Sequence, residues 1–494
     1  MSFLPFEALV NLVRGLRHEE EPAAHEDEVA AGEPLPEQGK QRSPEARKPV
    51  DGEQQRDARQ GRQHEAHPPG EGLLATRQPP REDRDEDDVV DPQDHLKGGE
   101  GEERDPRGRV HEPRHAAPPV VVCSSCSRWR LCGQGGWRGP HESVWWGRMR
   151  EIDGSQRSGS GTIVRTAVAL AALLGEELRV VNVRARRNPP GLRPQHLRAV
   201  EAVAEVCGAQ VEGAEVGSQA FTFRPSGHLR SGRFVWDIGT AGSATLLAMT
   251  VLPVAAFGPG PSTFRIRGGL FQDFAPSAFH LQHVVLPMLG RMGIRAELEI
   301  VRPGYVPTGG GIVELRVQPT TGPLRPLDLQ EQGAVVRVWG IALASHLRAR
   351  RVGERMAQRC AHRLRSAGLE ARIEVVNDET APQPGAALAV FAETTTGVRL
   401  GADRAGAPGR PSEAIADDVA RMLLEDLRSG ATVDRHFADQ LVVYAALAEG
   451  TTEFRVPEVT DHVDTNLWLV QEITGAGVSL DGQRVRIRGI GYHR

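Results

Sequence analysis

Hydrophobic and polar positions alternate with two different periods from Ile152 to the C-terminus of this 494-residue chain. Apolar residues recur at helical spacing in stretches such as 162–174, and short runs rich in β-branched residues lie between such stretches. Seven of these runs are predicted to be strands: 178–185, 221–225, 262–269, 296–301, 335–343, 388–393 and 484–490. Helices that alternate with short strands in this way predict an α/β (α+β) fold.

One unit recurs within this pattern: a helix that ends at or near a glycine is followed by an amphipathic strand. It occurs at 204–216, 289–301, 363–376 and 470–482. The unequal spacing argues against a solenoid and predicts several similar helix-on-sheet units, with a segment inserted between two of them. The Pro- and Gly-rich stretch 318–334 marks the expected start of this insert, and 425–437 marks its end.

The N-terminal part of the chain has a different composition. From His18 to Pro118 charged residues, Gln, Pro and Gly dominate and aromatic residues are absent, so little apolar surface offsets the chain entropy. We expect residues 1–149 to form a low-complexity, disordered extension. Met149 directly precedes the first segment with a globular pattern, so a second hypothesis is that the natural chain starts there; recovery of peptides from 18–118 in native protein would contradict it.

Residues 120–150 are rich in Cys and Trp but lack helical or strand periodicity. Cys123, Cys126, Cys132 and His141 could in principle form a Cys3His zinc site. Their spacing matches no zinc signature, so unstructured residues are the favoured interpretation.

Length and charge exclude some classes of function. The chain is long enough for two to four domains and a large core. Its formal net charge is −5, from 60 Lys+Arg and 65 Asp+Glu, so any contact with nucleic acid must use a local basic patch. The five cysteines form no disulfide framework, which favours a reducing, cytoplasmic location. Neither an apolar run of roughly 20 residues nor a signal peptide is present, so we expect no membrane contact.

A Gly- and Ser-rich segment, 158–162, immediately precedes the helix expected at 162–174. Backbone N–H groups and the positive end of a helix dipole would converge there, which suits a phosphate or a carboxylate. The segment lacks the Lys-Ser/Thr ending of a Walker loop, and a plain strand-to-helix turn is the alternative. Arg165 lies one turn into the apolar helix and should meet an anion, because a buried unpaired guanidinium costs several kcal/mol. That anion is a ligand or a structural carboxylate.

A basic loop follows the first of these helices. Arg184, Arg186, Arg187, Arg193 and His196 lie on a segment stiffened by prolines, ahead of a helix expected from about His196. Arginine offers bidentate donors to phosphate, and proline reduces the entropy that is lost when those donors are ordered. The alternative is a solvated basic loop.

Near the C-terminus, Asp439 and Gln440 begin an apolar helical run. His462 is expected on a loop just before Asp464, a candidate N-cap for the next helix. The positive end of a helix disfavours imidazolium, so the ring should be neutral with a lone pair available near pH 7. Taken alone, a loop histidine is most often ordinary surface.

The order of seven segments resembles the RNA 3′-terminal phosphate cyclases, from about Arg150 to the C-terminus. The segments are IDGS…GSGTIVRTAVAL, VRARRNPPGLRPQHL, GAQVEGAEVGSQAFTFRP, GTAGSATLL, GYVPTGGGIVEL, ADQLVVYAAL and HVDTNLWLV. The resemblance implies a large catalytic domain of repeated helix-on-four-stranded-sheet units at 150–329 and 430–494. A smaller α/β insert domain would occupy 330–429.

The resemblance also implies an activity. The family is an ATP-dependent ligase class that converts an RNA 3′-terminal phosphate to a 2′,3′-cyclic phosphodiester through a histidine–AMP intermediate and an RNA-adenylate, releasing AMP and pyrophosphate. It would use ATP with Mg²⁺ or Mn²⁺, and RNA 3′-phosphate ends would be its partner. The oligomeric state stays open.

By resemblance, His462 would be the adenylated nucleophile, and Arg165, Arg184 and Arg187 would neutralise phosphate charge. Gln195 matches a substrate-contact position. Asp439 and Gln440 would lie near the nucleotide, Gly159 and Gly161 at its phosphates, and Asp439 is the candidate metal ligand.

Two positions depart from the family pattern. Ser158 stands where many members have a glutamate associated with the metal, and a hydroxyl is a much weaker ligand for a hard cation. His436 stands where a tyrosine is usual. Two other functions stay open: a non-catalytic cyclase-like RNA-binding scaffold in ribosomal RNA processing, and a small-molecule transferase of the same architecture.

Overall fold

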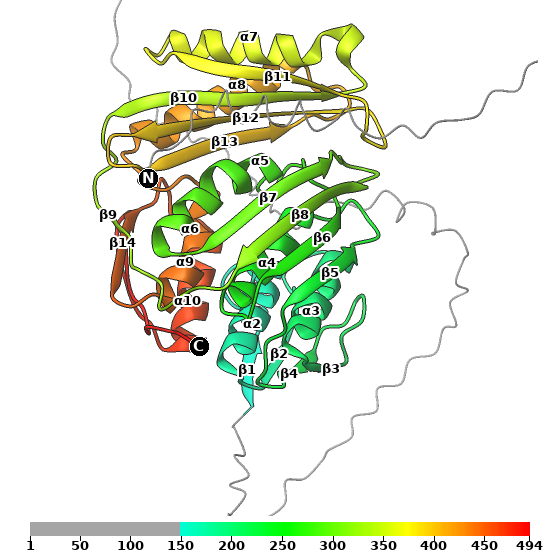
Figure 1. Cartoon of the computed structure of the whole chain (residues 1–494), viewed down its shortest axis with the longest axis vertical. Coiled ribbons are helices and arrows are strands. Elements are labelled where there is room, and N and C mark those ends of the chain that lie inside the picture. Colours follow the sequence, from blue (N-terminus) through cyan, green and yellow to red (C-terminus); the bar gives the residue numbers. More distant parts are fainter. Residues whose placement is uncertain (1–148) are drawn as a thin grey trace, which may run out of the picture. The chain divides into compact units, whose positions relative to one another are not determined.

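The computed structural model of the protein describes residues 149–494. The predicted extension over 1–149, apart from its last residue, lies outside the described residues, as do the candidate zinc ligands Cys123, Cys126, Cys132 and His141. The predicted α/β fold is confirmed, because the strands of the described part form four-stranded sheets that pack against helices (Figure 1). Each predicted strand run contains a strand; β6 (Ser262–Gly268), for example, buries every second side chain.

Three of the sheets share one topology. The first contains β1 (Arg150–Asp153), β2 (Leu178–Val181), β4 (Phe221–Arg224) and β3 (Gln210–Glu212), in that order. The second contains β5 (Gly232–Asp237), β6, β8 (Gly311–Gln318) and β7 (Arg295–Arg302). The third contains β9 (Asp328–Leu329), β14 (Thr451–Arg455), β16 (Arg484–Arg488) and β15 (Gly477–Asp481). In each, the first two strands are parallel and the other neighbours are antiparallel, so the chain repeats one unit.

The expected insert interrupts the third unit. Strand β9 pairs in parallel with β14 through Leu329 and Phe454, although a long stretch of chain separates them. The prediction that the extra segment lies between two units is therefore wrong: it lies inside one unit, after its first strand. A two-residue strand has too little periodicity to be recognised in the sequence, so its membership of the third sheet was invisible there.

Helices form the interior of the three repeated units. They include α2 (Gly161–Leu174), α3 (Pro194–Cys207), α4 (Ala244–Ala256), α9 (Phe437–Leu447) and α10 (Asp461–Thr474). Helix α4 is buried on all sides and α2 nearly so, which explains why both sequences are apolar around the whole helix. They contact one another, and the sheets cover them from outside (Figure 1).

The glycines that recur at the predicted helix ends do so for a conformational reason. Gly208, Gly293 and Gly475 have left-handed backbone angles and directly follow α3, α6 (Leu286–Met292) and α10. Gly368 adopts the same conformation shortly after α7 (Val352–Arg365). The predicted helix-glycine-strand unit is thereby confirmed.

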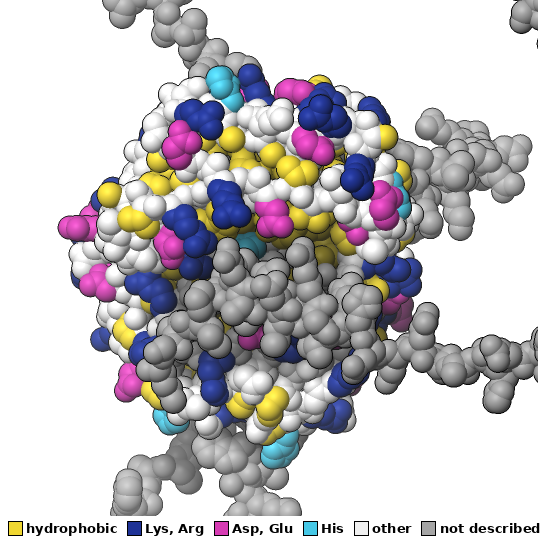
Figure 2. All heavy atoms as spheres, turned by 45° about the horizontal axis from the view of Figure 1, so that its top comes forward, with side chains coloured by type: hydrophobic (Ala, Val, Ile, Leu, Met, Phe, Trp, Pro, Cys, Tyr) yellow, Lys and Arg dark blue, Asp and Glu magenta, His cyan; other side chains and the backbone are white. Residues whose placement is uncertain are grey.

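The fourth sheet contains β11 (Ala371–Asp378), β10 (Val335–Ser345), β12 (Gly385–Thr394) and β13 (Arg399–Ala405). Helices α7 and α8 (Ser412–Arg428) pack against each other and against this sheet (Figure 1). Arg355 and Arg359 of α7 pair with Glu413 and Asp417 of α8 at 2.8 Å. Such exposed pairs contribute about 0–1 kcal/mol each. Figure 2 shows basic and acidic side chains interspersed on the face turned forward there.

A buried ion pair joins the fourth sheet to the repeated units. His280, at the end of α5 (Ala278–His280), lies 2.9 Å from Asp434 Oδ2 just before α9. The same carboxylate accepts a hydrogen bond from Gly401 N of β13 at 2.8 Å. Burial opposes both charges, but each partner stabilises the charged form of the other. The pKa of His280 is therefore raised, and the pKa of Asp434 is lowered.

The cysteines and the helix lengths of the described part bear on the expected disulfide content and on the expected lack of membrane contact. Cys207 and Cys360 are buried free thiols, and burial raises their pKa to about 11 and about 12. None of the helices in residues 149–494 is both long enough and apolar enough to cross a membrane.

Candidate active site

The Gly- and Ser-rich segment forms the turn between β1 and α2. Ser160 is the N-cap of α2, and its side chain accepts a hydrogen bond from Thr162 N at 3.3 Å. Gly159 has a left-handed backbone, and its N–H donates to Gln156 O at 2.8 Å, so this N–H serves the turn. Gly161 begins the helix, where an added Cβ would lie 2.1 Å from His196 Nε2. Glycine at 161 therefore allows close contact between α2 and the buried His196.

Ser158 takes part in a cluster of hydroxyl groups. Its Oγ lies 2.9 Å from Ser160 Oγ and 2.9 Å from Thr465 Oγ1 of α10. Its backbone N–H also donates to Thr465 Oγ1 at 3.1 Å. These contacts attach the turn before α2 to the helix that carries His462.

His462 is the second residue of α10 and not part of a loop. The N-cap is Thr460, whose side chain accepts a hydrogen bond from Val463 N at 3.2 Å. The prediction of Asp464 as N-cap is wrong, because both residues can cap a helix and Thr460 is the one that accepts the bond. Asp464 lies in the first turn instead, where its negative charge interacts favourably with the positive end of the helix dipole. It also pairs with Arg157 at 3.1 Å.

Thr162 contacts both Arg165 and His462, two of the candidate site residues from the sequence. Its Oγ1 lies 3.0 Å from His462 Nδ1 and accepts a hydrogen bond from Arg165 Nη2 at 3.2 Å. Arg165 is 7% exposed, so the guanidinium is held inside the molecule at this point. The hydroxyl oxygen has two lone pairs and can accept from both nitrogens.

Asp439 completes this group from the first turn of α9. Burial raises the pKa of its carboxyl group, whereas the nearby His462 and Arg165 and the hydrogen bond from Gln440 lower it. Gln440 Nε2 donates to its Oδ2 at 2.8 Å. The backbone oxygen of Asp439 accepts a hydrogen bond from Asn466 Nδ2 at 3.0 Å, and Asn466 Oδ1 accepts one from Thr166 Oγ1 at 2.9 Å. Side chains of α2, α9 and α10 therefore meet in one place.

The basic loop contacts the turn before α2. Arg187 Nη2 donates to Ser158 O at 3.3 Å, and Arg186 Nη1 donates to Arg157 O at 2.8 Å. Burial lowers the pKa of Arg187, while the neighbouring Asp461 raises it. Arg184 is 1% exposed and donates to the carbonyls of Pro189 and Gly191 at 3.0 and 3.2 Å, so its guanidinium helps to shape the loop itself.

Gln195 lies at a different helix end. Helix α3 begins at Pro194, slightly before the predicted position, and Gln195 is its second residue. Gln195 Oε1 accepts a hydrogen bond from Ser243 N, the N-cap of α4, at 3.1 Å. The structure thus brings Arg165, Asp439, Gln440 and His462 together and places Gln195 beside the start of α4.

Two residues of the site were not singled out from the sequence. Thr465 and Asn466 follow His462 by three and four positions, so they share its face of α10. That spacing was a usable signal, because small polar residues on an otherwise apolar helix face usually have a partner.

The site opens onto a cavity of about 240 Å³. Its lining includes Asp273, His436, Asp439, Thr460 and His462. A much smaller space of about 30 Å³ lies against Thr162, Arg165 and Gln440. The imidazole and the carboxylate therefore face a hollow in the protein.

The protein groups alone do not fit a divalent cation. Residues 149–494 contain no group of three or more His, Cys, Asp or Glu side chains arranged to hold a metal ion. The side chains whose charges act most strongly on Asp439 are nitrogen bases, His462 and Arg165, and not further carboxylates.

Comparison with known proteins gives one consistent result. A protein-family model described as RNA 3′-terminal phosphate cyclase matches residues 156–480. A protein of that name from Hyperthermus butylicus is 42% identical over 358 residues, covering 70% of this chain and 99% of the relative. Proteins of the same name from Methanopyrus kandleri and Nitrosospira multiformis are each 39% identical, covering 95% and 96% of those relatives and 67% and 69% of this chain.

Among solved structures, the enolpyruvyl transferase NikO from Streptomyces tendae is 15% identical. The match covers 69% of this chain and 49% of that chain, with a TM-score of 0.29. A score this low carries no structural argument.

Proposed function

Because the chain belongs to the RNA 3′-terminal phosphate cyclase family, we propose that it converts an RNA 3′-phosphate to a 2′,3′-cyclic phosphodiester with ATP. AMP and pyrophosphate would be released. The observation that supports this function most strongly is the position of His462, whose ring contacts Thr162 beside Arg165 and lines a cavity together with Asp439. In that reaction the protein is an ATP-dependent ligase that acts on RNA ends.

The reaction requires three transfers. His462 attacks the α-phosphorus of ATP, an N–P bond forms, and the bond to pyrophosphate breaks. An oxygen of the RNA 3′-phosphate then attacks the same phosphorus, and the N–P bond breaks to leave an RNA-adenylate. Finally the 2′-hydroxyl attacks the terminal RNA phosphorus, loses its proton and expels AMP. The activation is needed because a phosphate monoester has no good leaving group.

Thr162 selects the attacking nitrogen. An Nδ1–H that donates to Thr162 Oγ1, 3.0 Å away, puts the lone pair of the neutral ring on Nε2. Arg165 donates to the same oxygen through one of its two lone pairs, which leaves the other lone pair for Nδ1–H. Nε2 is accordingly the atom that attacks ATP.

The remaining predicted residues act on charge and orientation. Arg165 and Arg187 neutralise phosphate charge, because Arg165 contacts Thr162 at the start of α2 and Arg187 contacts Ser158 in the turn before it. Arg184 shapes the loop that carries Arg187, and Gln195 contacts the RNA end from the start of α3. Gln440 orients the Asp439 carboxylate. Gly161 lets α2 begin directly against His196, and Gly159 permits the turn.

Mg²⁺ or Mn²⁺ would have to be brought by the ATP substrate, because the protein groups of residues 149–494 alone do not fit a divalent cation. Phosphate oxygens would supply most of its ligands, and Asp439 would be the protein carboxylate nearest to it, since Ser158 offers only a hydroxyl that the cluster with Ser160 and Thr465 already uses. Residues 150–329 with 430–494 and residues 330–429 form the catalytic and insert domains of a cytoplasmic enzyme.

The test is self-adenylation. Wild-type protein incubated with α-³²P-labelled ATP and Mg²⁺ or Mn²⁺ should acquire an acid-labile label, and His462→Ala should acquire none. His228→Ala, at an exposed position, is the matched control and should label as wild type. Labelled protein given a 3′-phosphate oligoribonucleotide should then form the cyclic end. Persistent labelling of His462→Ala contradicts the assignment, and RNA binding by an unlabelled wild type would indicate the non-catalytic scaffold.

A further inference from the structure

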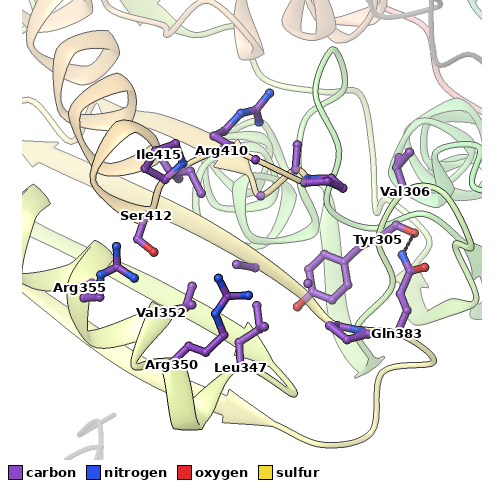
Figure 3. A pocket seen from close by; sticks show the side chains of 18 of the residues that line it. Tyr305, Val306, Leu347, Arg350, Val352, Arg355, Gln383, Arg410, Ser412 and Ile415 are labelled. Atoms are coloured by element: carbon purple, nitrogen blue, oxygen red, sulfur yellow. Dashed lines mark hydrogen bonds between the residues drawn. The ribbon is translucent and has the colours of Figure 1, made fainter.

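A larger cavity lies away from His462. It has a volume of about 470 Å³ and lies between η3 (Arg348–Arg350), the starts of α7 and α8, and the segments around Tyr305 and Gln383 (Figure 3). Its size falls within the range of roughly 300–1,000 Å³ that is typical of small-molecule sites. No residue that lines it also lines the cavity at His462.

One polar side chain in this cavity belongs to a largely buried residue and has no hydrogen-bond partner in residues 149–494. Ser412, the first residue of α8, is 5% exposed, and its hydroxyl makes no hydrogen bond to any side chain or backbone group of residues 149–494. Figure 3 shows it directed into the cavity. A hydroxyl on a largely buried residue that faces a cavity without a partner in the described residues is available to a ligand there.

The charge of the lining favours an anion. Arg355 pairs with Glu413 through two hydrogen bonds of 2.8 Å, and Arg410 pairs with Asp273 at 2.6 Å. Arg350, the third lining arginine, is exposed, extends into the cavity in Figure 3, and has no ion pair within the described part of the chain. One positive charge without an ion pair in the described residues therefore lines the same cavity as Ser412.

Two helix dipoles add to this charge. Helices α7 and α8 both begin at the cavity, and neither N-cap residue, Arg351 or Pro411, makes a side-chain capping hydrogen bond. No N-cap side chain therefore occupies either helix start, although Ala414 N–H of α8 already donates to Pro411 O at 3.1 Å. Phosphate is the group that such helix ends bind most readily.

The rest of the wall suits a flat, partly apolar ligand. It is formed by Pro307, Pro384, Pro408, Leu347 and Ile415. Tyr305 is fixed at its base by a hydrogen bond of 2.7 Å between its hydroxyl and Ser345. A phosphate alone would leave this wall uncovered, whereas a sugar and a base would cover it.

We propose that this cavity binds a nucleoside phosphate, with the phosphate at Ser412, Arg350 and the start of α8 and the nucleoside against the proline-rich wall. Two sources offer this chemistry: a nucleotide of an RNA strand upstream of its 3′ end, or a free nucleoside phosphate. The first source rests on the proposed function, and it is geometrically reasonable because Asp273, the partner of Arg410, lines the cavity at His462. The phosphate site itself does not depend on the cyclase reaction.

The experiment uses full-length wild type, Arg350→Glu and Ser412→Asp. An aspartate at the start of a helix interacts favourably with the helix dipole, so Ser412→Asp should fold. Its negative charge repels phosphate, so the variant should not bind the ligand. Arg348→Glu, in the same short helix but outside the cavity lining, is the matched control. Each protein is titrated with AMP by calorimetry, and with fluorescein-labelled 3′-phosphate oligoribonucleotides of two and ten nucleotides by anisotropy.

If the cavity binds a free nucleotide, calorimetry should give two AMP molecules bound per wild-type chain, one at His462 and one in the cavity. Both variants, Arg350→Glu and Ser412→Asp, should bind only one. An RNA nucleotide predicts that both variants bind the ten-mer about tenfold or more weakly, with the dimer unchanged, as expected for lost hydrogen bonds to a charged group. If both variants match Arg348→Glu with all three ligands, the proposal is wrong. Should Ser412→Asp fail to fold, the exposed Arg350→Glu decides alone.

Labelling by α-³²P-ATP, measured in parallel, separates this proposal from the proposed function. Normal labelling with unchanged ligand binding in the variants overturns the cavity site and leaves the cyclase intact. If the wild type acquires no label but binds AMP through Arg350, the proposed cyclase function is wrong and the cavity site is supported.

Discussion

At the scale of single residues, the position of His462 depends on Thr162. The hydroxyl of Thr162 contacts a ring 300 positions further along the chain and also a buried arginine of its own helix. Two neighbours of His462 on α10, Thr465 and Asn466, attach the same helix to Ser158 and to the backbone of Asp439. The imidazole thus contacts the hydroxyl of Thr162, and the helix that carries it is held in place by Thr465 and Asn466.

Thr162→Val keeps the branched shape but removes the acceptor for Nδ1–H. We expect the single-turnover rate of adenylation to fall about 10-fold to 100-fold, which corresponds to the loss of a hydrogen bond to a charged group. The KM for ATP should change little, because the ring is misoriented while the arginines remain. Thr162→Ser should restore most of the rate. Equal rates for the valine and serine variants would contradict an orienting role.

At the scale of elements, the buried pair of His280 and Asp434 connects the end of α5, the start of α9 and β13. Its two charges lie in a fully buried place, so each stabilises the other against the cost of burial. Because Asp434 also accepts bonds from the backbone N–H groups of His436 and Phe437, it fixes the beginning of the helix that carries Asp439.

Asp434→Asn should destabilise the protein by about 3–5 kcal/mol, since it leaves a buried partner uncompensated. The matched control Asp417→Asn, which breaks exposed pairs between α7 and α8, should cost less than about 1 kcal/mol. Urea unfolding followed at fixed pH measures both. A similar, small loss in the two variants would show that the buried pair is not a structural link.

The pair also predicts the sign of a pH dependence. The pKa of His280 is raised above its ordinary value of 6.5 in the folded protein, so its contribution is complete below that value and is lost as the pH rises through the folded pKa. The pKa of Asp434 is lowered, so its contribution is lost only as the pH falls through that lower value. The wild-type urea midpoint should therefore fall above pH 6.5, and Asp434→Asn should lack this fall.

At the scale of the whole molecule, a net charge of −5 provides no general attraction for RNA. Basic and acidic side chains are interspersed on the face shown in Figure 2, and we expect the arginines gathered at the site to provide the binding. Affinity should then depend on the terminal phosphate and on the salt concentration.

A 3′-phosphate oligoribonucleotide should bind more tightly than its 3′-hydroxyl counterpart. If two or three phosphate charges are neutralised, affinity should fall about 7-fold to 20-fold between about 50 mM and about 200 mM salt. Arg187→Ala should reduce the logarithmic salt slope by about 0.7, whereas Arg348→Ala should leave it unchanged. Equal affinity for both RNA ends would favour a scaffold that binds RNA without acting on it.

Local patterning was sufficient to predict the class of fold, the strand runs and the glycines after α3, α6 and α10. These features depend on interactions within a few residues, such as the apolar period and the left-handed conformation that glycine adopts at a helix end. The candidate site could be reached from motifs and resemblance, because Arg165, Asp439 and His462 stand in recognisable segments. Its internal contacts could not, because none of them follows from neighbours in the chain.

Packing alone decided the rest. It placed the insert after a two-residue strand of the third sheet, chose Thr460 over Asp464 as the cap of α10, and directed Arg184 into its own loop. It also brought Thr162 to His462 and opened the cavity at Ser412. The physical reason is that period and capping are short-range properties of a chain, whereas the meeting of side chains hundreds of positions apart depends on how whole helices and sheets bury their apolar faces.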